Sequence, residues 1–209
     1  MPMMTSSLSI ISQTAGPKLN KLTCSLGIRS VVDLGCATGT WVDAFLRCGV
    51  DATGVEGSHS ARRYLVCPTD RVVFADLREP LRIPARPVDL ALSIEVAEHI
   101  EAKYADTFVA NILRYKPRLI FMTAAPPGQG GHFHVNEQPY DYWIERFRKF
   151  DYAPDAGLRE LVAGFVDEGR RLQDVPAVMQ WPEMHHQGVW IPQWMPANLL
   201  IFSKVSLNS

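Results

Sequence analysis

A chain of 209 residues is long enough for one domain with a substantial core, and its 47% apolar and 21% charged residues are typical of a globular protein. The formal net charge of −1 provides no global basic field for nucleic acid or for an acidic membrane surface. No apolar run approaches the roughly 20 residues that span a bilayer. The four cysteines form no CxxC pair, which argues against a zinc cluster or a redox motif. We therefore expect a cytoplasmic protein with reduced thiols and no membrane partner.

Short β-branched or aliphatic runs alternate with helix-like segments through the first 125 residues. Parallel strands need crossover connections, so this alternation predicts a parallel sheet with helices on both faces. Ser58 is placed to cap the second helix. The expected strands span 30–35, 51–57, 71–77, 88–94 and 118–124, and the expected helices span 41–49, 58–66 and 97–116.

The pattern changes after Pro127, where a glycine-rich loop leads into an aromatic helix. We expect that helix at 139–150, a second one near 157–171 and a final strand at 197–205.

The domain prediction follows from this change of pattern. We expect one domain over residues 1–209, in which 1–16 form a flexible tail. Residues 127–196 are expected to cap the carboxyl edge of the sheet, which is where ligands bind in open α/β sheets.

The segment VVDLGCATGTW, residues 31–41, connects the first strand to the first helix through a tight turn. Gly35 and Gly39 let backbone amides approach a ligand at the helix N-terminus without an obstructing Cβ. A dinucleotide fold requires G-x-G-x-x-G, and two of those three glycines are missing here. Asp33, at the end of the strand, would also repel a pyrophosphate. The turn therefore favours a ligand with a cationic amino group and a ribose but no phosphate.

The string VVDLGCATG resembles the first motif of class I S-adenosylmethionine-dependent methyltransferases. Glu56 ends the second strand and Asp76 follows the third, at positions where this family has acids. The string SIEVAEH, residues 93–99, resembles the family's loop and helix start after the fourth strand. Each acid alone could be a turn or cap carboxylate, but three acids at the ends of successive strands indicate one pocket. The match covers about residues 20–125 and the closing strand near 199–205.

The resemblance implies a three-layer α/β/α Rossmann-like fold with a seven-stranded, mostly parallel sheet, and S-adenosyl-L-methionine as the cofactor. It implies that Glu56 binds the ribose hydroxyls, Asp76 the adenine amino group and the Asp33–Gly39 turn the methionine end. Ala37 replaces a common middle glycine, which the turn tolerates if the residue there avoids a positive φ. The cofactor-binding residues that the resemblance implies are Asp33, Gly35, Cys36, Ala37, Gly39, Trp41, Glu56, Gly57, Ser58, Asp76, Leu77, Ser93, Ile94 and Glu95.

Three histidines are candidates for catalysis. Transfer to a hydroxyl requires an aligned nucleophile and removal of its proton. The segment GGHFHVNEQPYDYW, residues 130–143, follows the fifth strand and should hang over the carboxyl edge. We predict that His134, His132 or His99 is the base, because histidine titrates near neutral pH. The alternative is that these histidines only hydrogen-bond the loop.

A further alternative is a divalent metal site of mixed carboxylates and imidazoles. Its ligands would be Glu95, Glu98, His99 and either His132 or His134. This set resembles the metal-dependent methyltransferases that act on the 3′-terminal ribose of small RNAs. Similar strings also occur in metal-free members of the superfamily, and the chain has no evident RNA-binding module. The sequence therefore favours a site without a metal and an acceptor that is not a nucleic acid.

Strings near the C-terminus bear on the acceptor. PPGQGGHFHVN, QPYDYWIERF and the closing NLLIF resemble a group of small bacterial and phage-type methyltransferases, some of whose relatives belong to polysaccharide or natural-product pathways. This resemblance implies O-methylation of a small molecule or glycan. The rivals are the metal-assisted RNA enzyme and a non-catalytic module that keeps the fold.

Two aromatic clusters lie in the region 127–196. The first has helical spacing and is expected to pack in the core: Tyr140, Tyr142, Trp143 and Phe147. The second could line a substrate mouth or form a buried loop: Trp181, His185, His186, Trp190 and Trp194.

Overall fold

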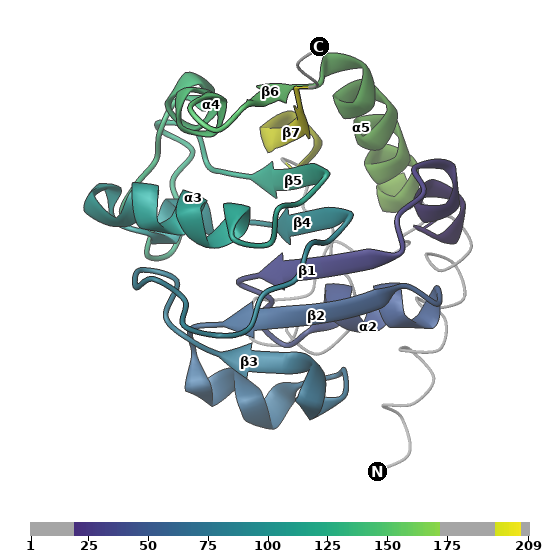
Figure 1. Ribbon diagram of the computed structural model, residues 1–209. Coiled ribbons are helices and arrows are strands. Elements are labelled where there is room, and N and C mark those ends of the chain that lie inside the picture. Colours follow the sequence, from purple (N-terminus) through teal and green to yellow (C-terminus); the bar gives the residue numbers. More distant parts are fainter. Residues whose placement is uncertain (1–18, 172–194, 206–209) are drawn as a thin grey trace.

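The computed structural model describes residues 19–171 and 195–205, which form a seven-stranded sheet with helices on both faces (Figure 1). The strands lie in the order β3-β2-β1-β4-β5-β7-β6. Strands β1 to β5 pair in parallel, whereas β7 is antiparallel to both β5 and β6. The predicted three-layer fold with a mostly parallel sheet is confirmed. The strands are β1 (Ser30–Leu34), β2 (Asp51–Glu56), β3 (Val72–Phe74), β4 (Leu90–Ser93), β5 (Leu119–Thr123), β6 (Tyr152–Pro154) and β7 (Leu199–Lys204).

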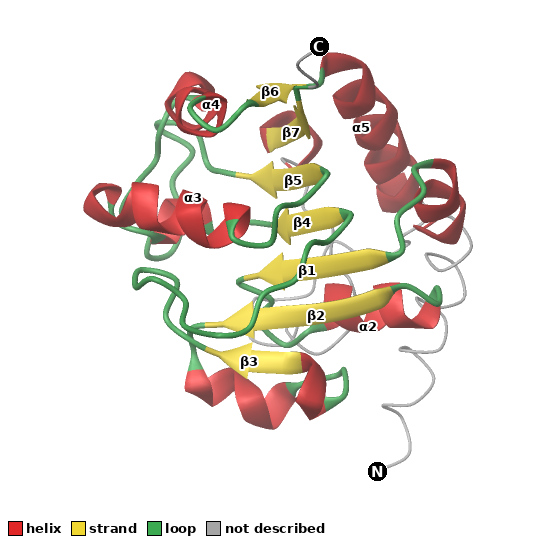
Figure 2. Cartoon of the chain, in the orientation of Figure 1, coloured by secondary structure: helices red, strands yellow, loops and turns green. Residues whose placement is uncertain are grey.

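Helices and 3-10 turns connect these strands (Figure 2). None of the described helices is long and apolar enough to cross a membrane. A helix at residues 19–25 precedes β1. The other helices are α2 (Thr40–Arg47), α3 (Ala105–Leu113), α4 (Tyr140–Arg148), α5 (Ala156–Arg171) and α6 (Met195–Asn198), and the 3-10 turns are η1 (His59–Tyr64), η2 (Thr69–Arg71), η3 (Ala97–His99) and η4 (Ala102–Tyr104).

The central strands are buried on both faces, which explains their continuous apolar sequences. In β5, Ile120 and Met122 pack in the core that contains α3 and α4. The alternate residues Leu119 and Phe121 pack in the core that contains α2 and α5. Of the four aromatics expected in the core, Trp143 and Phe147 in α4 are fully buried, whereas Tyr140 and Tyr142 are partly buried against it.

The long helix expected at 97–116 is wrong in its first half. The chain makes the two turns η3 and η4 there, and α3 begins only at Ala105. The cause is a tertiary contact: the carbonyl oxygen of Glu98 accepts hydrogen bonds from the amides of Val135 (2.9 Å) and Asn136 (3.1 Å). That oxygen is therefore already used by a distant loop and does not support a helix through this stretch.

Two further expectations need correction. The helix expected at 58–66 is the shorter turn η1, and Ser58 makes no side-chain cap bond because its Oγ lies 2.8 Å from that of Ser60. The region expected to cap the sheet contributes β6, which pairs with β7 and so extends the sheet. Residues 172–194, with the second aromatic cluster, lie outside the described part of the chain, as do residues 1–18.

Asn111 in α3 fastens the loop that follows β3. The side chain is 3% exposed. Its oxygen accepts from the amide of Leu81 (2.9 Å), and its nitrogen donates to the carbonyls of Leu77 (3.0 Å) and Glu79 (2.9 Å). This loop carries Asp76, so Asn111 supports a predicted cofactor contact from the core side.

We expect Asn111→Ala to lower the free energy of unfolding by roughly 2–4 kcal/mol, because it leaves buried backbone groups without partners. Urea unfolding followed by circular dichroism measures the change. The exposed Asn20→Ala provides a control with the same substitution and should change stability by less than about 1 kcal/mol. Equal effects of the two variants would contradict an anchoring role for Asn111.

Candidate active site

The glycine turn after β1 has the geometry that the sequence predicts. Gly35 has φ +83° and Gly39 has φ +76°, a region that favours glycine. A Cβ at Gly35 would overlap the side chain of Val96, and one at Gly39 would overlap Cys67. The turn therefore requires glycine at both positions, for backbone conformation and for space.

Ala37 corrects one expectation about this turn. Its φ is +48°, so the turn accepts alanine although the condition of avoiding a positive φ is not met. The amide of Ala37 donates to Oε2 of Glu56 at 2.7 Å, and the amide of Ser58 donates to Oε1 at 2.7 Å. Glu56 thus joins the ends of β1 and β2 at the carboxyl edge. A carboxylate has about four acceptor sites, so Glu56 retains capacity for two hydroxyl groups.

Asp33 is a buried acid beneath the turn. It is 2% exposed, and its Oδ2 has no hydrogen-bond partner among the residues that the structure describes. Burial, and to a lesser extent the charge of Glu56, raises the pKa of Asp33 to about 8. A cationic amino group bound in the turn would compensate the charged form, so the residues fit the ligand type that the sequence predicts.

The loop after β3 presents Asp76 in a different environment. Nε and Nη2 of Arg78 bind its carboxylate at 3.0 and 2.7 Å. These hydrogen bonds lower the pKa of Asp76, so it stays ionised at neutral pH. The neighbouring Leu77 is 4% exposed and packs in the core, so its side chain does not reach the site.

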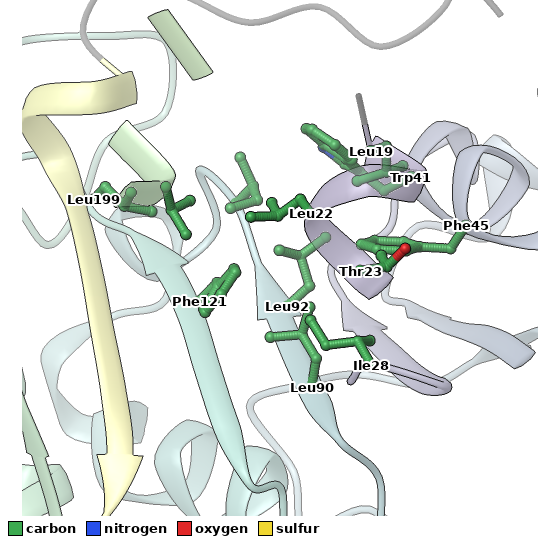
Figure 3. A pocket seen from close by; sticks show the side chains of 12 residues that line it. Leu19, Leu22, Thr23, Ile28, Trp41, Phe45, Leu90, Leu92, Phe121 and Leu199 are labelled. Atoms are coloured by element: carbon green, nitrogen blue, oxygen red, sulfur yellow. The ribbon is translucent and has the colours of Figure 1, made fainter. Parts of the chain in front are cut away.

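Four of the residues predicted to bind the cofactor, Trp41, Ser93, Ile94 and Glu95, make contacts within the fold. Ser93 is buried and donates its hydroxyl to the carbonyl of Leu34 at 2.9 Å. Trp41 and Ile94 line an apolar pocket beneath the helix at 19–25, over the sheet face that α2 covers (Figure 3). Glu95 has φ +55° and donates its amide to Oγ1 of Thr123 at 2.7 Å, which ties the ends of β4 and β5 together.

Three further residues, Glu98, His99 and His134, come together in the structure. One potential ligand atom from each lies within 4.8 Å of the others. The rings of the two histidines lie 5.1 Å apart, edge to face. His132 is exposed and lies outside this group.

Glu98 is the buried member of the cluster. It is 0% exposed, and neither carboxylate oxygen has a hydrogen-bond partner in the described part of the chain. Burial first, and the charge of Glu95 second, raise the pKa of Glu98 to about 8. Two acids in one buried place are costly unless a proton or a cation compensates them.

The glycine-rich loop determines how both histidines can act. Nδ1 of His99 is 3.1 Å from the carbonyl oxygen of Phe133, and Nδ1 of His134 is 2.9 Å from Oε1 of Glu137. Both partners are acceptors, so each Nδ1 carries a proton, and in a neutral imidazole the lone pair then lies on Nε2. This tautomer suits a base or a metal ligand equally well. Phe133 itself is 83% exposed, with a φ of +61° that is unusual for a bulky residue.

Comparison with known families identifies the family of this chain. A family model described as a methyltransferase domain matches residues 11–164. The chain belongs to this methyltransferase family. It is therefore an S-adenosylmethionine-dependent methyltransferase. A comparison with curated proteins gave no significant match.

Solved structures share the fold of this methyltransferase at low sequence identity. The methyltransferase domain of bacterial CtHen1-C is 15% identical, with a TM-score of 0.56 over 94% of this chain and 100% of that chain. Small RNA methyltransferase HEN1 is 16% identical, with a TM-score of 0.54 over 92% of this chain and 25% of that chain. A third structure is that of Burkholderia thailandensis 1,6-didemethyltoxoflavin-N1-methyltransferase, solved with 1,6-didemethyltoxoflavin and S-adenosylhomocysteine. It is 18% identical, with a TM-score of 0.52 over 92% of this chain and 79% of that chain.

The sequence interpretation missed Glu137 in this methyltransferase. Glu137 lies three residues after His134 in the string HVNE, and this close spacing in a loop was the available signal. The pattern that identifies Asp33, Glu56 and Asp76 is an acid at the end of a strand, and Glu137 lies in a loop instead. The structure shows that it contacts His134 directly.

Gly131 leaves the space that the His134 ring occupies, because a Cβ at this position would overlap the imidazole. We expect Gly131→Ala to displace the ring and break its bond to Glu137. The ring nitrogen signals of His134 in long-range ¹H–¹⁵N spectra should then shift to those of a solvent-exposed imidazole.

Gly49→Ala is the control, because Gly49 lies outside this loop, between α2 and β2, and a Cβ there meets open space although φ is +74°. It should cost about 1 kcal/mol of stability and leave the His134 signals unchanged. Unchanged His134 signals in Gly131→Ala would contradict the packing argument.

Proposed function

We propose that this methyltransferase transfers the methyl group to a hydroxyl oxygen of a small-molecule or glycan acceptor, with the help of a divalent cation. The proposed ligands are Glu95, Glu98, His99 and His134. The observation that carries the proposal is the convergence of Glu98, His99 and His134, with ligand atoms within 4.8 Å of one another. Mixed carboxylate and imidazole donors suit Mn²⁺ and similar ions.

Three features of the donor set fit a cation. Glu98 is fully buried with both oxygens unpartnered among the described residues, and Glu95 adds to the negative charge. With the proton on Nδ1, the neutral imidazole of each histidine offers Nε2 as the metal ligand. His134 also donates its Nδ1 proton to a carboxylate, the usual arrangement around a metal-bound histidine.

The residues then divide the chemistry as follows. Asp33 and the glycine turn would hold the methionine end of the cofactor, Glu56 its ribose and Asp76 its adenine, which leaves the electrophilic methyl carbon at the carboxyl edge. Glu95, Glu98, His99 and His134 would hold a divalent cation, which would supply Lewis acidity to lower the pKa of the acceptor hydroxyl. The acceptor oxygen forms a bond to the methyl carbon as the carbon–sulfur bond breaks, and the hydroxyl proton passes to a base. Exposed His132, outside the cluster, is our candidate for that base.

A second candidate function needs no cation. His134 and Glu137 form a carboxylate–histidine pair, in which the acid holds the imidazole as a general base. In that case His134 takes the hydroxyl proton directly, and general base catalysis contributes typically ~10²–10⁴-fold.

Cation dependence tests the proposal. Purified protein is incubated with radiolabelled S-adenosylmethionine and a panel of methyl glycosides and catechols, with Mn²⁺ or with excess chelator. We expect labelled ethers that form with Mn²⁺ and are lost with chelator. Equal turnover with chelator would support the histidine base and overturn the cation.

The same assay separates the acceptor classes. An RNA with a 3′-terminal diol and its 2′-deoxy counterpart are included, because the same donor set resembles that of the RNA ribose methyltransferases and HEN1 shares the fold. Methylation of the diol RNA alone would replace the small-molecule or glycan acceptor with RNA.

A further inference from the structure

We infer that Glu137 is the positioning residue of the proposed cation site: its carboxylate fixes His134 as a ligand and binds the glycine loop to it. This inference rests on the proposed function. Oε1 of Glu137 accepts from Nδ1 of His134 at 2.9 Å and from the amide of Gly130 at 2.7 Å. Oε2 accepts from the amide of Gly128 at 2.8 Å. One carboxylate therefore organises three donors from a ten-residue stretch.

The loop depends on this carboxylate for its shape. Gly128 has φ +85° and Gly130 has φ +69°, so their amides turn inward only in a conformation that favours glycine. Successive amides that point at one anion form a small anion-binding concavity, here occupied by a side chain of the same chain.

The same loop reaches the other members of the cluster. The carbonyl of Phe133 binds His99, and the amides of Val135 and Asn136 bind the carbonyl of Glu98. The side-chain nitrogen of Asn198, the last residue of α6, donates to Oε1 of Gln129 at 2.7 Å and so holds the far side of the loop. The loop that contains Glu137 is therefore hydrogen-bonded to Glu98 and His99 and carries His134. Of these three residues, only His134 contacts the Glu137 carboxylate directly, so a shift of that carboxylate would displace His134.

Charge and geometry both favour an orienting role over a ligand role for Glu137. Its two oxygens are already occupied by three donors. An imidazole whose Nδ1 proton is held by an ionised carboxylate is a better electron-pair donor at Nε2, and loss of such a partner typically weakens metal binding about 10–100-fold.

Titration of the whole protein with Mn²⁺, followed by electron paramagnetic resonance of the free ion, tests the inference. We expect Glu137→Gln to raise the Mn²⁺ dissociation constant about 10–100-fold. The amide can accept from His134 but lacks the charge, and its NH₂ group opposes the amide of one loop glycine. The conservative Glu137→Asp should restore part of the affinity. Glu145→Gln, on the exposed side of α4, is the matched control and should bind Mn²⁺ like the wild type.

A second measurement distinguishes positioning from a merely structural role. Melting temperatures are taken with and without saturating Mn²⁺, because a ligand that binds only the folded state raises the melting temperature according to its affinity. Positioning predicts that Glu137→Gln loses most of the rise caused by Mn²⁺. A structural role predicts a lower melting temperature without Mn²⁺ and an unchanged rise.

The possible failures have different signatures. If the wild type binds Mn²⁺ and Glu137→Gln binds it equally well, the inference is overturned and the proposed function stands. Wild type that binds no Mn²⁺ would overturn the cation itself, and the inference with it. If Glu137→Gln does not fold, an unchanged Mn²⁺ affinity in Glu137→Asp still overturns the positioning role.

Discussion

Glu98→Gln is expected to lower methyl transfer by about 10²–10³-fold, the loss that corresponds to several kcal/mol of electrostatic stabilisation from a bound cation. The substitution keeps the size of the buried side chain and removes its charge. Glu98 is the one fully buried member of the cluster, so we expect Mn²⁺ binding to disappear with the activity. Initial rates with radiolabelled cofactor, and Mn²⁺ titration of the same preparation, measure both effects.

The cofactor provides an internal control for this prediction. Glu98 lies outside the glycine turn, so S-adenosylmethionine should bind Glu98→Gln as it binds the wild type. Glu101→Gln makes the same change three residues further on, where the side chain is 41% exposed and lies near Arg78 and Lys103. Exposed pairs of this kind contribute little, so that variant should keep its activity. A Glu98→Gln enzyme with normal turnover would contradict the cation site.

The cofactor half of the site could be predicted because it depends on local sequence. Asp33 and Glu56 lie at the ends of strands, and the period and apolar character of a buried parallel strand locate those ends. Gly35 and Gly39 are needed for a backbone conformation that few residues other than glycine adopt. Each of these signals lies within about ten residues of the structure that it determines.

The rest of the site depends on contacts between distant segments. The turn at Glu98 replaces a helix because its carbonyl binds Val135 and Asn136, 37 and 38 residues later. Sequence spacing favoured His132 and His134 together, and the fold selects His134 because Glu137 and Gly131 place its ring. The φ of Ala37 also depends on a contact outside its own segment. Its positive value accompanies a hydrogen bond to Glu56 on the next strand. A local pattern does not contain such information.

The two buried acids also predict how stability depends on pH. In the folded protein without ligands the pKa of Asp33 is about 8, against an ordinary value of 3.8. Between these values the folded state holds a proton that the unfolded state has released, so stability falls as pH rises from about 4 to about 8. Glu98, with a pKa of about 8 against 4.5, adds to the same slope. Urea unfolding across this range should show the decline.

Asp33→Asn should remove the Asp33 share of that decline and weaken S-adenosylmethionine binding about 10–100-fold, the typical value of a hydrogen bond to a charged group. The two effects have one cause, because the charge that is costly in the empty pocket attracts the cationic amino group of the cofactor. Between about pH 5 and pH 7 the cofactor's amino group stays protonated, so wild-type affinity should increase with pH as Asp33 ionises, whereas the affinity of Asp33→Asn should stay flat over this range. Calorimetric titration at several pH values measures this, with Asp43→Asn in the exposed pair with Arg47 as the control. Parallel pH profiles in wild type and Asp33→Asn would mean that the buried acid does not face the amino group, and the orientation of the methionine end in the turn would have to be reassigned.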